Sequence, residues 1–236
     1  YNSSQVANVN DLQSKISSSL TTYAKSADLN KFGGRFKYSK VLNVIDNIDN
    51  SITSNITRVK IRRNLNALIN QFAQYELCFG NQFNIKPAGY NIKSTGFTID
   101  GFSNIAYLTD IPNKNASGNL DGSMKGILSV VTKNEKNQLQ ILVKEAGIVD
   151  YKHGEVILNT INITSTINEN DIIEIQAFPE SNDVVGLKDL YLNFNVSKST
   201  INTVKDVIAS GEDVSGVVFQ RDYYTSSYSN GDLERK

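Results

Sequence analysis

The sequence predicts an α+β protein. A small helix-strand-helix-strand unit is followed by a larger, mainly antiparallel β region of the sandwich or barrel type and by an extended C-terminal tail. Three observations support this: helical apolar spacing near the N-terminus, short alternating runs in the middle, and few aliphatic residues after position 220. We expect three parts, residues 1–66, 67–166 and 167–236.

An amphipathic helix is predicted close to the N-terminus, with Asn10 or Asp11 available as its N-cap. Its apolar side chains recur three and four residues apart on one face: Val9, Leu12, Ile16, Leu20 and Tyr23. This stripe belongs either to the core, which we favour, or to a partner-binding face. Leu12, Ile16 and Leu20 are therefore candidate interface residues.

A short strand and a second helix follow. Phe36 and Tyr38 occupy alternate positions after a Gly-Gly turn, and Ser39 is placed to cap a helix. The apolar side of this second helix comprises Val41, Leu42, Ile45, Ile48 and Ile52.

Residues 57–62 carry a basic side chain at every second position, which predicts a strand with one basic face. The basic patch comprises Arg58, Lys60, Arg62 and Arg63. A nucleic-acid contact would need such a patch, but the net charge is +0 and no aromatic side chain is interleaved for stacking. We therefore favour a solvated or interface-facing strand edge, where basic residues discourage unwanted pairing, and expect no nucleic-acid partner.

The middle of the chain contains many short alternating runs separated by turn residues, which is typical of an antiparallel sandwich or barrel. The expected strands cover residues 73–79, 105–111, 126–132, 138–143 and 173–177. Gly154 is expected to adopt the positive φ of a tight hairpin between two extended runs. Residues 168–171 and 179–183 are expected turns, and residues 113–122 a long polar loop.

The C-terminal part is expected to contain a strand over residues 190–196 and a short helix over residues 199–210. The polar tail that follows has no core of its own, but it carries Tyr223, Tyr224 and Tyr228. These tyrosines either belong to a disordered tail or anchor it on a neighbouring subunit. Both interpretations stay open, and the three are candidate interface residues.

The composition narrows the class of protein. Neutral net charge provides no general attraction to nucleic acid or to an anionic membrane. The 29 Asn residues suit turns and neutral hydrogen-bonded interfaces. A lone cysteine, Cys78, excludes an internal disulfide and is compatible with a reducing cytoplasm. No apolar run approaches a membrane-spanning length, so we expect no membrane insertion. Because the chain begins with Tyr1, we expect it to be a piece of a longer protein.

The sequence indicates no catalytic site. The nearest carboxylate pairs are Asp100 with Asp110 and Asp150 with Glu155, and no motif supports either of them. Residues 113–118 resemble the start of a calcium loop, but Asn stands at the first ligand position and Met124 at the twelfth. We therefore expect no enzymatic activity, no metal and no cofactor.

Several phrases of the sequence resemble the baseplate wedge subunit of T-even-like contractile-tailed bacteriophages, the gene product six family. They are YELCFGNQF at 75–83, STGFTIDGFSNIAYLTDIP at 94–112, GIVDYKHGEVIL at 147–158, DIIEIQAFPESNDV at 171–184 and YYTSSYSNGDLERK at 223–236. The resemblance covers most of the chain and is to the C-terminal part of that subunit.

The resemblance implies a structural, non-enzymatic role in the tail baseplate of a virion, after assembly in the host cytoplasm. Such subunits pair as dimers, bind other wedge proteins and form a ring that rearranges on tail contraction. We then expect exposed apolar surface on the first helix or the tail. The alternative is a β-rich carbohydrate-binding module of a tail or surface protein, which would need a concave aromatic groove. The absence of Trp counts against this alternative.

Overall fold

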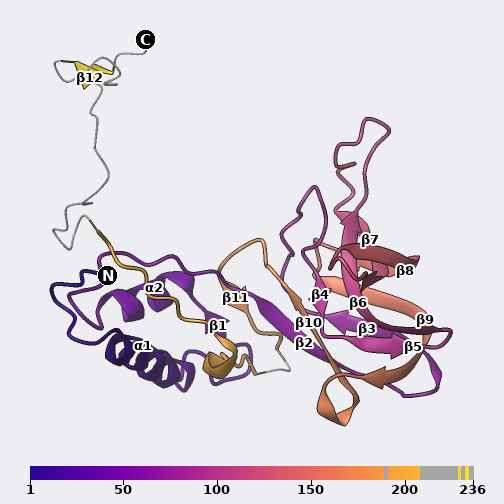
Figure 1. The fold of residues 1–236 in the computed structure, drawn as a ribbon, viewed down its shortest axis with the longest axis horizontal. Coiled ribbons are helices and arrows are strands. Elements are labelled where there is room, and N and C mark those ends of the chain that lie inside the picture. Colours follow the sequence, from indigo (N-terminus) through magenta and orange to yellow (C-terminus); the bar gives the residue numbers. More distant parts are fainter. Residues whose placement is uncertain (189–190, 208–227, 230–231, 234–236) are drawn as a thin grey trace.

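The structure is a computed structural model that describes residues 1–188, 191–207, 228–229 and 232–233. Figure 1 shows two helices at one end of the molecule and a β-barrel at the other. Each end has its own core of buried apolar side chains. The predicted α+β class, with a barrel-like antiparallel region, is confirmed.

The small domain is built on two helices, α1 (Val9–Ala24) and α2 (Tyr38–Asp46), with β1 (Arg35–Phe36) between them. The predicted helices are present, but both predicted caps are wrong. Asn8 caps α1, since its side chain accepts a hydrogen bond from the backbone N–H of Asn10. Lys37 occupies the N-cap position of α2 and provides no side-chain bond. Because α2 ends at Asp46, the expected apolar residues Ile48 and Ile52 lie beyond the helix. Both still pack on the core of the small domain.

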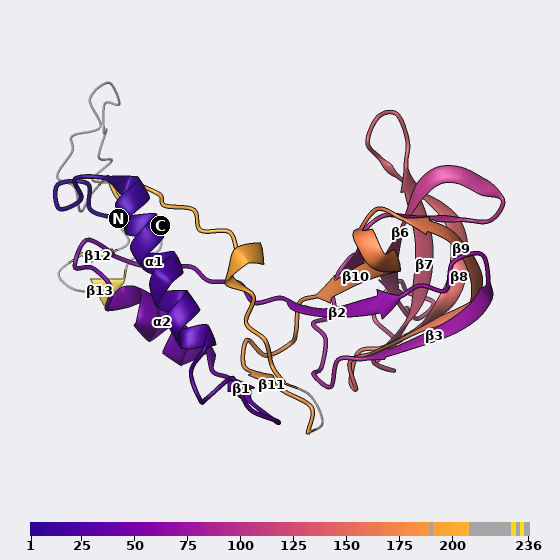
Figure 2. The same cartoon turned by 90° about the horizontal axis from the view of Figure 1, so that it is seen from below.

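The C-terminal part of the described chain returns to the small domain (Figure 2). β11 (Val184–Val185) pairs with β1, and the 3-10 turn η2 (Val196–Lys198) follows. Val184 is 4% exposed in the core of the helices, and the ring of Phe194 contacts those of Tyr23 and Phe36 at centroid distances of 6.4 and 5.5 Å. The small domain is therefore discontinuous in sequence.

Two predictions for this returning segment are wrong. Residues 191–196 contain no strand beyond a single bridge between Tyr191 and Phe32, because their alternating side chains pack on helices. Residues 199–207, the described part of the expected helix, are not helical. β-Branched residues are frequent there and disfavour a helix. The backbone instead bonds to the N-terminus: the amino group of Tyr1 donates to the carbonyl of Val204 at 2.7 Å.

The barrel consists of five strands in chain order: β5 (Phe97–Ile99), β6 (Phe102–Pro112), β7 (Lys125–Lys133), β8 (Leu139–Asp150) and β9 (Glu155–Thr166). Each strand pairs with the next, and β9 pairs with β5 to close the ring. All five pairings are antiparallel. Five straight strands could not close a ring by antiparallel pairing alone. Strand direction reverses at each pairing, so the fifth strand would run parallel to the first. β9 changes partner along its length, from β8 at residues 155–158 to β5 at 163–166.

Four more strands extend this sheet: β2 (Ile61–Asn66), β3 (Phe72–Cys78), β4 (Lys93–Ser94) and β10 (Ile172–Ala177). β10 follows the 3-10 turn η1 (Glu169–Asp171). The strand expected at residues 57–62 begins only at Ile61, and residues 52–60 before it have no regular secondary structure. Ile61 lies opposite Ala177 in the β2–β10 pair, so the chain enters and leaves the barrel domain at adjacent positions.

The β8–β9 hairpin is as predicted. β8 ends at Asp150, β9 begins at Glu155, and Gly154 adopts a φ of +68°. A Cβ on Gly154 would lie 2.0 Å from the backbone oxygen of Asn81, so glycine is required there for space as well. Further along the chain, β12 (Tyr228–Ser229) pairs with β13 (Asp232–Leu233). The division into residues 1–66, 67–166 and 167–236 stays a prediction.

Candidate functional site

The predicted interface residues of α1 are not exposed. Leu12, Ile16 and Leu20 are 3%, 7% and 5% exposed and lie in the core that α1 forms with α2 and the returning segment. The expectation of exposed apolar surface on the first helix is therefore wrong, because this chain covers the stripe itself. A contact of these residues with another subunit stays a prediction and would require that core to open.

The predicted tail contacts are not described by the structure. Tyr223 and Tyr224 lie outside the described residues. Tyr228 begins β12, and only its backbone pairing with β13 is described. The anchoring role of these three tyrosines stays a prediction.

Of the first carboxylate pair, Asp110 is a buried structural group. Its carboxylate accepts hydrogen bonds from the backbone N–H of Ile92 at 2.6 Å and from the hydroxyl of Tyr151 at 2.7 Å. Burial, and next the charge of Asp110, raise the pKa of Tyr151 far above its usual range, so this hydroxyl remains a donor. Asp100 lies beyond the opposite end of β6, in the exposed turn after β5.

The second pair closes the β8–β9 hairpin, where Asp150 and Glu155 are opposite each other. Asp150 accepts hydrogen bonds from the backbone N–H and the ring of His153, both at 3.0 Å. Partial burial raises the pKa of Asp150, but these bonds outweigh it and hold the pKa below its usual value. The geometry is that of a turn stabilised by its own side chains.

In the polar loop at residues 113–122, side-chain oxygen atoms accept hydrogen bonds from backbone groups of the same loop. The side-chain oxygen of Asn115 accepts from the backbone N–H groups of Ser117 and Asn119. Among the described residues, no group of three acidic, histidine or cysteine side chains is placed to hold a metal ion. None of the helices in the described part of the chain is long and apolar enough to cross a membrane.

Two shallow depressions lie beside α1 and α2, with volumes of about 480 and 570 Å³. Asn47 and Ile48 line both, and neither is lined by an aromatic side chain. These depressions do not resemble the aromatic groove that a carbohydrate-binding module would need.

The outer face of the barrel carries a row of four isoleucines directly opposite one another on neighbouring strands. We call this the isoleucine row: Ile111 on β6, Ile127 on β7, Ile148 on β8 and Ile157 on β9. Ile148 is 52% exposed and the other three are half-buried. The adjacent row is charged and comprises Lys125, Asp150 and Glu155. An apolar strip beside a charged border is the usual make-up of a protein interface.

A smaller apolar patch lies over Gly96. A Cβ at that position would meet side-chain atoms of both Ile105 and Ile167, so these two side chains come together there. They are 45% and 58% exposed. The isoleucine row is the larger feature and is our candidate functional site.

The isoleucine row was not predicted, although the sequence contains a signal for it. The barrel strands contain consecutive apolar residues, as in Ile127-Leu128, Ile148-Val149 and Val156-Ile157-Leu158. A run without alternation is apolar on both faces of its strand. The inner member of each run fills the barrel, and the outer member faces away from it.

A comparison with known families matches the N-terminal part of the chain. Residues 1–64 match the family described as baseplate structural protein gp6, C-terminal domain III. No curated protein matches the chain. The matched region contains α1, β1, α2 and the start of β2. The match confirms the gp6-like resemblance over these residues, whereas the phrases quoted from residues 75–236 lie outside it. The match covers residues 1–64 alone, so this part of the chain is similar to a domain of a baseplate structural protein.

Proposed function

We propose that this chain is a subunit of the baseplate wedge in a contractile tail. It pairs with a second copy, binds other wedge proteins, and contributes to a ring that rearranges when the tail contracts. Assembly takes place in the host cytoplasm, without nucleic acid or membrane insertion. The role is mechanical and involves no catalysis.

The isoleucine row is the observation that carries the proposal. An apolar strip on a soluble protein costs free energy while it faces water. This cost is removed when another surface covers the strip. Ile148 lies between two other members of the row, so a partner that covers it also covers Ile127 and Ile157. The match of residues 1–64 to a baseplate family supports a second subunit as that partner.

Light scattering of the chain over a dilution series tests this. We expect a reversible dimer, in which the isoleucine rows of two copies cover each other. Ile148→Lys places an ammonium group in the contact and should raise the dimer dissociation constant about tenfold or more.

Ile56→Lys is the matched control. Ile56 is 92% exposed on the segment before β2 and does not belong to the row, so its substitution should leave the dimer unchanged. A chain that stays monomeric at every concentration would contradict self-pairing. Equal effects of the two substitutions would exclude the isoleucine row as the contact.

A further inference from the structure

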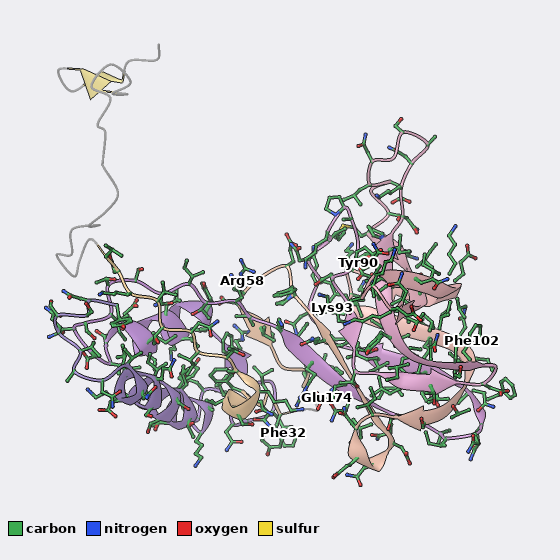
Figure 3. All side chains as sticks on the ribbon, in the orientation of Figure 1. Phe32, Arg58, Tyr90, Lys93, Phe102 and Glu174 are labelled. Carbon is green, nitrogen blue, oxygen red and sulfur yellow. The ribbon has the colours of Figure 1, made fainter. Side chains whose placement is uncertain are left out.

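A second surface lies where the barrel domain meets the small domain, on segments that are distant in sequence. We call it the junction surface: Arg58, Lys60, Lys86, Tyr90, Lys93 and Phe178. Arg58, Lys60, Tyr90 and Lys93 are exposed, and the other two are half-buried. Figure 3 shows Arg58, Tyr90 and Lys93 on the same side of the molecule.

Two lysines of this surface share one aromatic ring. The ammonium groups of Lys60 and Lys86 lie over the ring of Phe178, at 5.4 and 4.6 Å from its centroid. The electron-rich face of the ring attracts both cations. This attraction holds two like charges near each other that would otherwise separate into solvent.

Further cations lie on the same outer face of the sheet. Arg62 and Lys93 flank Gln176 in the β2–β10–β4 register. Arg62 is paired with Glu174 at 3.1 Å, and Lys198 also contacts Glu174. By contrast, Arg58, Lys60, Lys86 and Lys93 form no ion pair within the described part of the chain. Four uncompensated cations are therefore concentrated on a chain whose net charge is +0.

The loop that carries Lys86 and Tyr90 is held by backbone hydrogen bonds. The backbone N–H of Gly89 donates to the carbonyl of Lys86 at 2.7 Å, and that of Tyr90 donates to the carbonyl of Asp110 at 3.0 Å. Gly89 has a φ of +77°, and a Cβ there would lie 2.5 Å from the same Asp110 carbonyl. Tyr90 has a φ of +65°, which residues other than glycine seldom adopt. The loop thus presents a 40% exposed tyrosine, which lies between Lys86 and Lys93 in the sequence.

We propose that the junction surface binds an acidic polypeptide segment of another protein. Carboxylates of an extended segment would pair with the lysines and with the guanidinium of Arg58, while the Tyr90 ring contacts its apolar atoms. Because the loop is already ordered, little conformational entropy is lost on binding. The isoleucine row takes no part, so this proposal goes beyond self-pairing and its test is separate.

An acidic polypeptide fits better than a nucleic acid. The ring of Phe178 is engaged by two ammonium groups, whereas strand binding needs rings that are free to stack on bases.

Fluorescence anisotropy of a labelled oligoglutamate peptide, titrated with the whole chain, tests the proposal. We expect binding that weakens as salt is raised, and no binding of an oligoglutamine peptide of the same length. The double variant Lys60→Gln with Lys86→Gln should weaken binding about tenfold. Lys60→Arg with Lys86→Arg should restore most of it, since the charges and the ring contacts are kept.

The matched control is Lys136→Gln with Lys144→Gln, which removes the same charge from exposed positions on the β7–β8 side of the barrel. If this control weakens binding as much as the junction variant, attraction is not specific to the junction surface and the proposal fails. It also fails if the wild-type chain does not bind oligoglutamate. Tighter binding of an oligonucleotide of equal charge, lost in the junction variant, would replace the acidic polypeptide with nucleic acid.

Discussion

Asp110 illustrates how one residue fixes distant parts of the barrel domain. Its carboxylate joins Tyr151, beyond the end of β8, to Ile92 before β4, and its carbonyl binds the N–H of Tyr90. A buried carboxylate without such donors would be strongly destabilising, so both bonds are needed. The same residue was considered as a catalytic candidate from the sequence, where its burial was not visible. Its geometry is instead that of an anchor for the loop of the junction surface.

Another carboxylate, Asp49, gives the small domain a dependence on pH. The ammonium group of Lys15 donates to it at 2.9 Å and the backbone N–H of Ser51 at 3.1 Å. The bond from Lys15, followed by those from Ser51, lowers the pKa of Asp49 to about 2 from an ordinary value of 3.8. The folded state therefore favours the ionised carboxylate. Its stabilising effect is fully present at pH values above the unfolded pKa of 3.8. It is lost as the pH falls from about 4 to about 2.

Asp49→Asn should therefore reduce the loss of stability between about pH 4 and pH 2, while it lowers stability slightly near neutral pH. The effect is small, because the ion pair is partly solvated. Urea unfolding midpoints at several pH values measure it. Glu135→Gln, in the exposed turn after β7, is the control and should follow the wild-type pH profile. Identical profiles for Asp49→Asn and wild type would contradict this assignment.

At the scale of elements, α2 receives its N-terminal hydrogen bond from a remote part of the chain. The backbone N–H of Tyr38 donates to the side chain of Asp183 at 2.7 Å, across 145 positions in sequence. Lys37, at the local cap position, provides no such bond. Asp183 thus joins the returning segment to the start of the helix.

Asp183→Ala should lower the free energy of unfolding by about 0.5–2 kcal/mol, which is the usual effect of losing an N-cap acceptor. Asp183→Asn keeps an acceptor oxygen and should stay close to wild type. Thermal or urea unfolding of the two variants measures the difference. If Asp183→Ala is as stable as Asp183→Asn, the bond does not contribute.

The sequence predicted those elements whose signal is local. The stripe of α1, the alternation of β10 and the hairpin glycine at position 154 follow from side-chain periodicity and backbone sterics within a few residues. The cap of α2 was assigned to Ser39 because a local pattern cannot reveal Asp183. For the same reason, the strand expected at 190–196 was wrong: alternation indicates one buried face, but not whether a strand edge is available for pairing.

The candidate surfaces could be predicted only in part. Arg58, Lys60 and Arg62 were recognised as a basic patch, because they are close in sequence. Lys86, Lys93 and Phe178 join them only through the fold, and Arg62 is compensated by Glu174. The isoleucine row depends on strand register, which a single sequence does not specify.

At the scale of the whole molecule, the barrel domain is an insertion in the small domain. The chain leaves the small domain before Ile61 and returns after Ala177, and these two residues are paired. The side chain of Asn81 further joins the two parts, since it exchanges hydrogen bonds with the backbone N–H and carbonyl of Val185. The family match at residues 1–64 therefore covers only one portion of a domain that residues 184–206 complete.

This arrangement predicts which fragments fold. Residues 1–64 alone should show no cooperative thermal transition, because Val184 and Phe194 are missing from the core. Residues 1–60 joined by a short Gly-Ser linker to residues 180–207 should fold, and residues 59–179 should fold separately as the barrel. Near-ultraviolet circular dichroism and thermal unfolding of the three fragments measure this. A cooperative transition for residues 1–64 alone would contradict the discontinuous domain.

The pairing of Ile61 with Ala177, where the chain enters and leaves the barrel domain, also determines which bonds bear an applied force. Tyr1 is bonded to Val204 through its amino group and to Asp206 through its carbonyl, at 2.7 and 2.8 Å. A pull applied at Tyr1 and Val207 is therefore borne first by these two bonds within the small domain. While they hold, and while Ile61 stays opposite Ala177, no load reaches the barrel. The barrel therefore lies outside the path of the applied force, and its contacts can persist while the force acts on the small domain.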